Sequence, residues 1–545
     1  MEAFRTALAA AQTTRNDRDG RRFVFVPYDQ LGAHAGPLSR EDARGLGLVL
    51  VECPEKAARR PYHKQKLALV LTNLRHFALE QAARGVAVRH VVAPSYAAAL
   101  DRLVPELGPM RVMRPAEREL RSELAPLVEA KKLELVPHEG WLTTREDLPA
   151  DPPWRMDVFY RNVRRRLGVL MDKGKPVGGK FSFDADNRRA WRGEPPAPPL
   201  PTFEVDAITR EVGDLVRERM GRHPGALDLE ALPATAADTE RAWSWAKRQC
   251  LPTFGPYEDA MSTRSRNLFH TRISALLNLG RLSARRVVDE TVALDVPLAS
   301  KEGFIRQVLG WREFVRHVHD ATDGFRVIRG ATQPVLPAPG DGGFGAWRGE
   351  PWPAAAGGDG GSRTSVLGAD RPVPPAYWGA ASGLRCLDEV IRSVWEEGYS
   401  HHITRLMVLS NLAMLLDVSP RDLTDWFWAA YVDAYDWVVE PNVHAMGTFG
   451  VGDLMTTKPY VAGSAYIDKM SDYCDGCRFD PKTSCPYPSL YWAYLGRHSA
   501  ALARVDRMKL PVIAEARRTP EQKRAAAAVF ARVSAALARG EELAP

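Results

Sequence analysis

The sequence predicts a Rossmann-like α/β domain with a parallel sheet at the N-terminus, followed by a large all-α domain. Residues 22–137 alternate short β-rich runs with helical ones, whereas helical spacing of apolar residues dominates after about residue 207. Strands separated by helices indicate βαβ units, in which the helices cover a parallel sheet. The run GEPPAPPLP at 193–201 lies between the two parts. It is expected to form neither a helix nor a central strand, because proline fixes φ and removes a backbone donor, and we therefore interpret it as a linker.

The individual elements follow from local patterns. Strands are expected at 22–27, 47–52, 86–93, 110–113 and 133–137, with helices at 64–84, 95–103 and 116–131. The first strand is not followed by GxGxxG, so the fingerprint of dinucleotide binding is absent. In the second half, helices are expected at 268–282, 302–318, 384–394, 402–416 and 421–432.

These patterns divide the chain into an N-terminal extension (1–20), an α/β domain (21–145), an interdomain linker (146–206) and a helical domain (207–545). Within the helical domain, residues 337–375 are rich in glycine and proline. Such a composition has little capacity to bury a core, so we expect a long surface loop there.

The composition is that of an ordinary globular protein. Of 545 residues, 45% are apolar, and 74 Lys and Arg against 67 Asp and Glu leave a net charge of +7. This mild excess permits a polyanionic partner without requiring one. There is no secretory signal pattern and no run of the roughly 18–20 apolar residues that a membrane helix needs. We therefore expect a cytoplasmic protein with reduced thiols and no membrane partner.

Three cysteines near the C-terminus form a metal-ligand pattern. Cys474 and Cys477 make a CxxC pair, and Cys485 follows seven residues later, directly before a proline. This layout is typical of zinc sites and of iron–sulfur clusters, and spacing alone does not choose between them. Cys386, in an expected helix, is a candidate fourth ligand. Cys53 and Cys250 carry no such pattern and are expected to be buried thiols.

Three segments resemble the FAD-binding regions of the cryptochrome/photolyase superfamily: HTRISALLNLGRLS at 270–283, GFIRQVLGWREF at 303–314 and DAYDWVVEPN at 433–442. Hydroxyls and backbone N–H groups at the start of a helix suit a diphosphate. The resemblance makes the helical domain a flavin-binding domain. It implies FAD contacts by Tyr257, His270, Thr271, Ser274, Gln307, Trp311, Arg312, Asp433 and Asn442.

A narrower resemblance covers nearly the whole chain. GYSHHITRLMVLSNLAML at 398–415, KPYVAGSAYI at 458–467, PVGGKFSFDADNRR at 176–189 and the cysteine pattern together resemble the iron–sulfur bacterial cryptochromes and prokaryotic (6-4) photolyases. The resemblance implies a monomer that repairs pyrimidine (6-4) photoproducts in UV-damaged DNA, double- or single-stranded, by light-driven electron transfer from reduced FAD. It also implies that Cys386, Cys474, Cys477 and Cys485 ligate a 4Fe–4S cluster.

The same family pattern implies roles for further residues. His402 is the expected proton donor at the lesion, with His401, Met446, Tyr460 and Tyr466 around it. Trp378 and Trp426 are the expected electron carriers. Phe427 follows Trp426 where relatives often carry tyrosine, and phenylalanine cannot form a stable neutral radical by losing a proton. Trp428 is a candidate substitute.

The α/β domain of this family holds an antenna chromophore, 6,7-dimethyl-8-ribityllumazine. The segment YDQL at 28–31 resembles the family's GDQL, and Tyr28 in place of glycine would narrow the site. The resemblance implies an antenna contact by Asp29, with Glu55 or Glu52 as a second carboxylate. Arg478 and Lys482, beside the cysteines, are expected DNA contacts.

Other functions explain fewer of these features. A blue-light photoreceptor of the same fold would use the same FAD and cluster, and it remains the alternative to repair. A light-independent binding protein would leave the flavin-like segments unexplained. A radical-SAM enzyme needs CxxxCxxC, which the sequence lacks. A zinc-ribbon module would account for the cysteines but not for the flavin-like helices.

Overall fold

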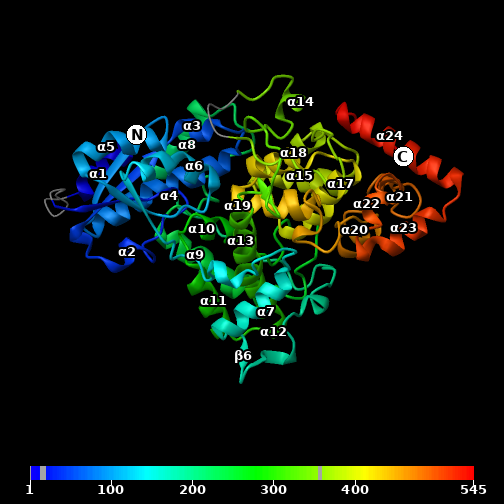
Figure 1. The fold of residues 1–545 in the computed structure, drawn as a ribbon, viewed down its shortest axis with the longest axis horizontal. Helices are drawn as coiled ribbons and strands as arrows, with labels where there is room; N and C mark the ends of the chain where they lie inside the picture. Colours follow the sequence, from blue (N-terminus) through cyan, green and yellow to red (C-terminus); the bar gives the residue numbers. More distant parts are fainter. Residues whose placement is uncertain (1, 13–19, 354–358) are drawn as a thin grey trace.

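The computed structural model describes residues 2–12, 20–353 and 359–545. The N-terminal α/β unit lies at one end of an elongated molecule and the C-terminal helices at the other (Figure 1). Within this described chain, none of the helices combines the length and apolar character that crossing a bilayer requires.

A five-stranded parallel sheet forms the centre of the α/β unit, in the order β3-β2-β1-β4-β5. Its strands are β1 (Arg22–Phe25), β2 (Leu46–Glu52), β3 (Ala87–Val92), β4 (Met110–Met113) and β5 (Leu133–Val136). β2 is buried along its whole length, as expected for an apolar strand with neighbours on both sides. The expected parallel α/β architecture is confirmed.

Helices cover both faces of this sheet. α4 (Lys64–Ala83), α5 (Tyr96–Leu107) and α6 (Arg118–Glu129) lie close to their expected bounds. The segment expected as an N-terminal extension contains α1 (Glu2–Ala11), which buries Phe4 and Leu8. α1 packs against α4 and α8 (Ala207–Arg219), so its apolar stripe completes the outer layer of the α/β unit.

The segment expected as a linker is partly structured. α7 (Met156–Leu167) buries Phe159, Tyr160 and Val163 and packs against the helix at 306–312. A small antiparallel hairpin, β6 (Met171–Asp172) with β7 (Lys175–Pro176), follows it. The proline-rich run at 193–201 lies in a longer stretch, 187–206, that contains neither helix nor strand, which agrees with the restriction that proline imposes.

The rest of the chain is largely helical, as expected. Its main α-helices are α9 (Ala236–Trp245), α10 (Ser274–Asn278), α11 (Ala284–Ala293), α12 (Leu298–Ile305), α13 (Glu313–Ala321), α15 (Arg385–Glu397), α18 (Pro420–Ala430), α21 (Pro486–Arg497), α23 (Lys509–Ala516) and α24 (Pro520–Ala538). The helix expected at 268–282 is wrong in extent. Leu268 and Arg272 have φ of 46° and 53°, outside the helical region, so the helix begins only at Ser274.

Four π-helical segments occur in the described chain: η6 (Ala246–Cys250), η7 (Arg306–Arg312), η9 (Arg405–Ser410) and η10 (Glu440–Gly447). A π turn adds a residue to the α-helical repeat and is common at functional sites. η7 and η10 carry expected site residues, and η9 continues α16 (His402–Thr404). Three of the four π-helical segments therefore coincide with segments that sequence motifs single out.

Residues 337–375 are more than a surface loop. They contain α14 (Phe344–Arg348), where Phe344 is buried and its ring lies 5.4 Å from that of Trp378. The expectation of little core packing is wrong here because two aromatic side chains, Phe344 and Trp347, anchor the segment on Trp378. Part of the expected loop, 354–358, lies outside the described residues.

The different burial of two leucines in the sheet predicts that their replacement by alanine lowers the free energy of unfolding by very different amounts. Leu48, on β2, is fully buried, whereas Leu135, on the edge strand β5, is 42% exposed. Leu48→Ala should lower the free energy of unfolding by about 2–5 kcal/mol, because it leaves a cavity. Leu135→Ala should lower it by less than about 0.5 kcal/mol. Denaturant unfolding measures both, and equal losses would contradict this placement of the strands.

Candidate functional site

Three histidines from two segments meet near the centre of the helical half. The rings of His270 and His401 stack at 4.3 Å, and the ring of His402 lies 5.5 Å from that of His270. Burial lowers the pKa of His401 to about 3 and lowers that of His270 as well, so both are neutral at pH 7. The side chain of His402 is 41% exposed. Of the adjacent pair, only His402 is open to an incoming ligand.

Asp259 joins the expected lesion residues, although sequence reasoning missed it. Its Oδ2 accepts a hydrogen bond from the Tyr466 hydroxyl at 3.0 Å, and its Oδ1 lies 3.5 Å from Nε2 of His402. Arg188 approaches Oδ2 at 3.8 Å. Burial alone would raise the pKa of Asp259, but these partners outweigh it and lower the pKa. Asp259 is therefore an ionised carboxylate that holds Tyr466 and faces His402.

The other two residues expected at the lesion, Tyr460 and Met446, pack against two different hydrophobic clusters. Tyr460 is partly buried against the same core cluster as Tyr466, and burial raises the pKa of its hydroxyl. Met446, on η10, packs against the core that includes Trp437 and Leu454. The structure thus brings His402 and Tyr466 together through Asp259, whereas Met446 belongs to the neighbouring layer.

Asp433 organises a second polar group. Its Oδ2 accepts from the Ser274 hydroxyl at 2.7 Å, and Arg405 pairs with both carboxylate oxygens at 3.1 and 3.0 Å. Asn278 Nδ2 donates to the Asp433 carbonyl at 2.9 Å. Burial would raise the pKa of Asp433, but Arg405 outweighs it and keeps the carboxylate ionised. Sequence reasoning found Ser274 and Asp433 but missed Arg405 and Asn278.

Two buried atoms beside these groups lack partners. His270 Nε2 and His401 Nδ1 have no hydrogen-bond partner among the described residues. Buried polar atoms are nearly always bonded, so these two nitrogens are available to hydrogen-bond a polar ring. A flavin has such a ring, together with hydroxyl and phosphate groups that Ser274 and Arg405 can bind. The residues present therefore fit FAD.

The remaining expected flavin contacts are spread more widely. Gln307 Nε2 donates to Glu258 at 2.6 Å, next to Asp259 in the chain. Tyr257 donates to the carbonyl of Glu194, and Asn442 to that of Val438. Thr271 is partly buried just before α10, and Trp311, on η7, lies edge-on to Phe314. None of these contacts joins them directly to the Asp433 group.

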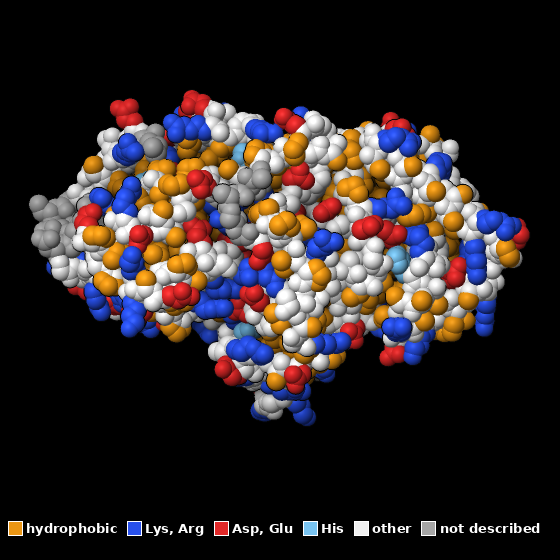
Figure 2. Space-filling view, turned by 45° about the horizontal axis from the view of Figure 1, so that its top comes forward, with side chains coloured by type: hydrophobic (Ala, Val, Ile, Leu, Met, Phe, Trp, Pro, Cys, Tyr) orange, Lys and Arg blue, Asp and Glu red, His pale blue; other side chains and the backbone are white. Residues whose placement is uncertain are grey.

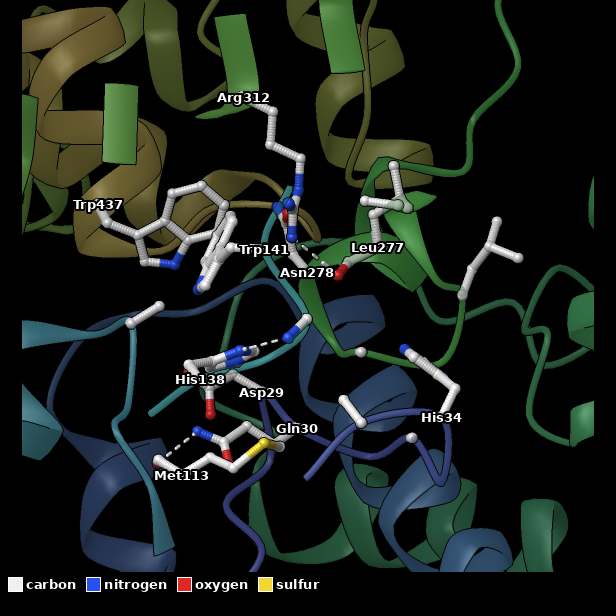
Figure 3. A pocket seen from close by; sticks show the side chains of 17 residues that line it. Asp29, Gln30, His34, Met113, His138, Trp141, Leu277, Asn278, Arg312 and Trp437 are labelled. Carbon is white, nitrogen blue, oxygen red and sulfur yellow. Dashed lines mark hydrogen bonds between the residues drawn. The ribbon is translucent and has the colours of Figure 1, made fainter. Parts of the chain in front are cut away.

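A cleft lies between the α/β unit and the helical half. Asp29, Gln30 and His138 line one side of it, and Arg312, Asn278 and Trp437 the other (Figure 3). The Arg312 guanidinium lies 4.2 Å from the ring of Trp141. Arg312, expected to contact the flavin, lines this cleft, and its Nε donates to Oδ1 of Asn278 at 3.4 Å.

Asp29 is the unusual group in the cleft. Neither of its carboxylate oxygens has a hydrogen-bond partner among the described residues, and burial raises its pKa to about 7. Tyr28 stacks on Tyr435 at 6.1 Å and occupies space beside it. Glu55, the expected second antenna contact, is exposed on α3 (Pro54–Ala58) and does not line the cleft.

The four expected metal ligands come together from three places. Cys386 is near the start of α15, Cys474 and Cys477 follow α20 (Ala465–Met470), and Cys485 immediately precedes α21. Burial raises the pKa of the Cys386 thiol, and the other three sulfurs raise it further, so the four lie close together. Cys250 is buried as expected, whereas Cys53 is partly exposed.

Four cysteine thiols that meet in this way can hold either a single zinc ion or an iron–sulfur cluster.

The expected electron carriers and the expected DNA contacts differ in their burial. Trp378 and Trp426 are both buried, and a third tryptophan, Trp395, contacts each of them. Arg478 pairs with Glu542, whereas Lys482 is exposed. On the face seen in Figure 2, basic and acidic side chains are interspersed, so this face carries no uniform positive field.

Comparisons with known proteins agree with this arrangement. A family model described as deoxyribodipyrimidine photo-lyase-related protein matches residues 24–231. A (6-4) photolyase of Agrobacterium fabrum is 33% identical over 543 residues, covering 94% of this chain and 99% of the relative.

Solved structures share the fold. A bacterial class III photolyase from Agrobacterium tumefaciens matches with a TM-score of 0.51 and 14% identity, over 95% of this chain and 99% of the other. A Synechocystis cryptochrome matches with a TM-score of 0.52 and 15% identity, over 78% and 82% of the two chains. At these identities the structures show the fold alone. Together with the full-length sequence match, they show that the chain belongs to the photolyase-related family of the cryptochrome/photolyase superfamily.

Proposed function

We propose that this chain is a DNA photolyase that repairs pyrimidine (6-4) photoproducts with light absorbed by bound FAD. The observation that carries the proposal is the open His402, which faces Asp259 and Tyr466 and lies beside the buried, unpartnered imidazoles of His270 and His401. The resemblance to a (6-4) photolyase over 94% of the chain supports the same reaction.

In this mechanism FAD, when bound and reduced, supplies one electron to the photoproduct on illumination. The damaged bases leave the duplex, which costs less for a poorly stacked lesion. His402 then donates a proton to the lesion from the exposed edge of the site, and ionised Asp259 stabilises the protonated imidazole. Tyr466, held by Asp259, lines the same opening. Ser274, Arg405 and Asp433 position the cofactor.

Removal of the proton donor should abolish repair without removing the flavin. We expect His402→Ala to lower the repair rate by about 100-fold or more, since a general acid contributes about 10²–10⁴. The assay illuminates reduced protein with DNA that carries a defined (6-4) photoproduct or a cyclobutane dimer. Wild type should remove only the (6-4) lesion.

His498→Ala is the matched control, because His498 pairs with Asp417 in the C-terminal helices and should leave repair intact. Absence of repair in wild type that contains bound FAD would contradict the proposal. That outcome would favour the blue-light photoreceptor of the same fold.

We propose a 4Fe–4S cluster on Cys386, Cys474, Cys477 and Cys485. The support is the meeting of the four cysteines from three separate segments, together with the resemblance of their sequence pattern to the iron–sulfur members of the family. Its position between α15 and the segment before α21 indicates an architectural role, because it would cross-link elements far apart in the sequence.

Metal analysis tests the cluster directly. Cys386→Ser should lose bound iron and acid-labile sulfide and should melt at a lower temperature, because one of four ligands is gone. Cys53→Ser, a change at a cysteine outside the group, should retain both. Zinc in place of iron in the purified wild type would contradict the assignment.

We propose that the cleft at Asp29 holds the antenna, 6,7-dimethyl-8-ribityllumazine. The support is a buried carboxyl group without a partner in a cleft of suitable polarity, lined also by Gln30 and Arg312. A ring N–H or a ribityl hydroxyl would give Asp29 the hydrogen bond that the protein does not provide.

The raised pKa of Asp29 predicts a pH-dependent stability. Because the folded protein holds this proton more tightly than the unfolded chain, antenna-free wild type should lose stability as pH rises from 3.8 to about 7. Asp29→Asn removes that loss. The free energy of unfolding of Asp29→Asn relative to that of wild type should be lowest below pH 3.8. It should increase between pH 3.8 and about 7 and stay constant above that range.

Denaturant unfolding of the two proteins between pH 3.5 and 8 measures this difference. Asp101→Asn, at an exposed carboxyl on α5, should leave the wild-type profile in place. An Asp29→Asn advantage that does not change with pH would show that Asp29 is not buried as described.

A further inference from the structure

Four tryptophans form a continuous line through the helical half. Trp426 on α18 lies 6.1 Å from Trp395 on α15, measured between ring centres. Trp395 lies 4.9 Å from Trp378, at the end of η8 (Pro375–Trp378), and Trp378 lies 5.7 Å from Trp347 on α14. No family motif marks Trp395 or Trp347. Each ring thus contacts the next, from the buried α18 to the glycine-rich insertion.

The inner end of the line is near the proposed flavin site. Tyr431 contacts Trp426 at 6.0 Å, and the Arg405 guanidinium lies 4.1 Å from the ring of Tyr431. Arg405 in turn pairs with Asp433. The outer end is Trp347, which is partly exposed. The line therefore connects the Asp433 group with the protein surface.

The inner indoles are held so that they cannot readily lose a proton. Trp395 and Trp426 both donate Nε1–H to the Tyr377 carbonyl, at 2.8 and 3.0 Å. Trp378 donates to the carbonyl of Gly342 at 2.9 Å. A backbone carbonyl is not a base at neutral pH, so a positive charge on any of these rings can be removed only by an electron from the next ring.

The charges around the rings favour this path over its alternatives. His63 stacks on Trp395 at 5.8 Å, and burial lowers its pKa to about 4, so it is neutral at pH 7. By contrast, the Arg60 guanidinium lies 3.6 Å from the ring of Trp428, and its charge opposes oxidation of that ring. Phe427 contacts Trp426 at 5.0 Å, but a phenyl ring is harder to oxidise than an indole.

The outer end suits release of a proton. The Arg348 guanidinium lies 4.1 Å from the ring of Trp347. Arg348 is itself exposed, so water screens its charge, and it opposes oxidation of Trp347 less than the buried Arg60 opposes oxidation of Trp428. The partly exposed indole can lose its N–H proton to water. Trp347 is thus the ring of the four where a neutral radical can form and persist.

We propose that Trp395 and Trp347 are electron-relay residues that extend Trp426 and Trp378 to the surface and photoreduce the flavin. Trp426 gives one electron to the photoexcited oxidised flavin and is refilled from Trp395, which is refilled from Trp378 and then Trp347. Trp347 loses its N–H proton to water. A soluble thiol then gives Trp347 one electron and one proton, and becomes a thiyl radical. The proposal rests on the proposed flavin site.

The test uses the holoprotein with oxidised flavin, blue light and a soluble thiol. Trp395→Phe should lose the long-lived tryptophan radical in transient absorption and should slow flavin photoreduction. Trp347→Phe should keep the early tryptophan radical cation but lose the long-lived neutral radical, because the charge then stops on Trp378. Trp492→Phe, on α21 beside Tyr491, removes an indole outside the line and should behave as wild type.

A second readout needs no light-driven chemistry. Trp378 and Trp395 stack with an angle of 21° between their planes, so they should give an exciton-coupled circular dichroism signal in the dark. Trp395→Phe should weaken this signal, because only the Trp347–Trp378 stack then remains, and Trp492→Phe should leave it unchanged. A weakened signal with unchanged radical yield and photoreduction would overturn the relay and leave the proposed function intact. A wild-type chain that binds no flavin would overturn both.

Discussion

A buried lysine fixes the segment on which the site depends. Lys66, on α4, donates from Nζ to the carbonyl oxygens of Trp428 and Ala434, at 3.0 and 2.6 Å. Burial lowers the pKa of this amine well below its usual range, so these two carbonyls replace the water that a lysine normally keeps. They bracket the end of α18 and the turn that carries Asp433. Lys66 thus helps to hold the turn from which Asp433 reaches Ser274 and Arg405.

The groups that can exchange protons are different from the aromatic rings that can carry electrons. His402 and Asp259 provide an imidazole and a carboxylate at an opening to solvent, where protons exchange readily. The tryptophans that begin on α18 are bonded to backbone carbonyls, which neither give nor take protons. The stacked, neutral His270 and His401 lie next to the first group and add no charge to it. A light-driven redox protein gains from this separation, because a proton lost at the wrong ring would trap the charge there.

The fold was largely predictable because its signals are local. The five strands and the helices α4 to α6 lie close to the ranges that apolar periodicity and breaker residues predict. The site was predictable where a motif carries it, as for Ser274, Asp433, His402 and the cysteines. Asp259, Arg405, Asn278 and Trp395 carry no motif, and their roles depend on long-range packing. The prediction for 337–375 was wrong because it was based on the high glycine content and gave no weight to Phe344 and Trp347, which pack against Trp378.

The π-helical segments constrain how this chain can change in length. Each holds one residue more per turn than an α-helix, so loss of a single codon within η7 would leave a regular helix behind. Every residue after the deletion would then rotate by roughly 100° about the helix axis. Arg312, the last residue of η7, would then leave the cleft that it now lines. Insertions and deletions in this lineage should therefore collect in segments without helix or strand, such as 193–201, and spare these short stretches, even though no regular secondary-structure pattern marks them in the sequence.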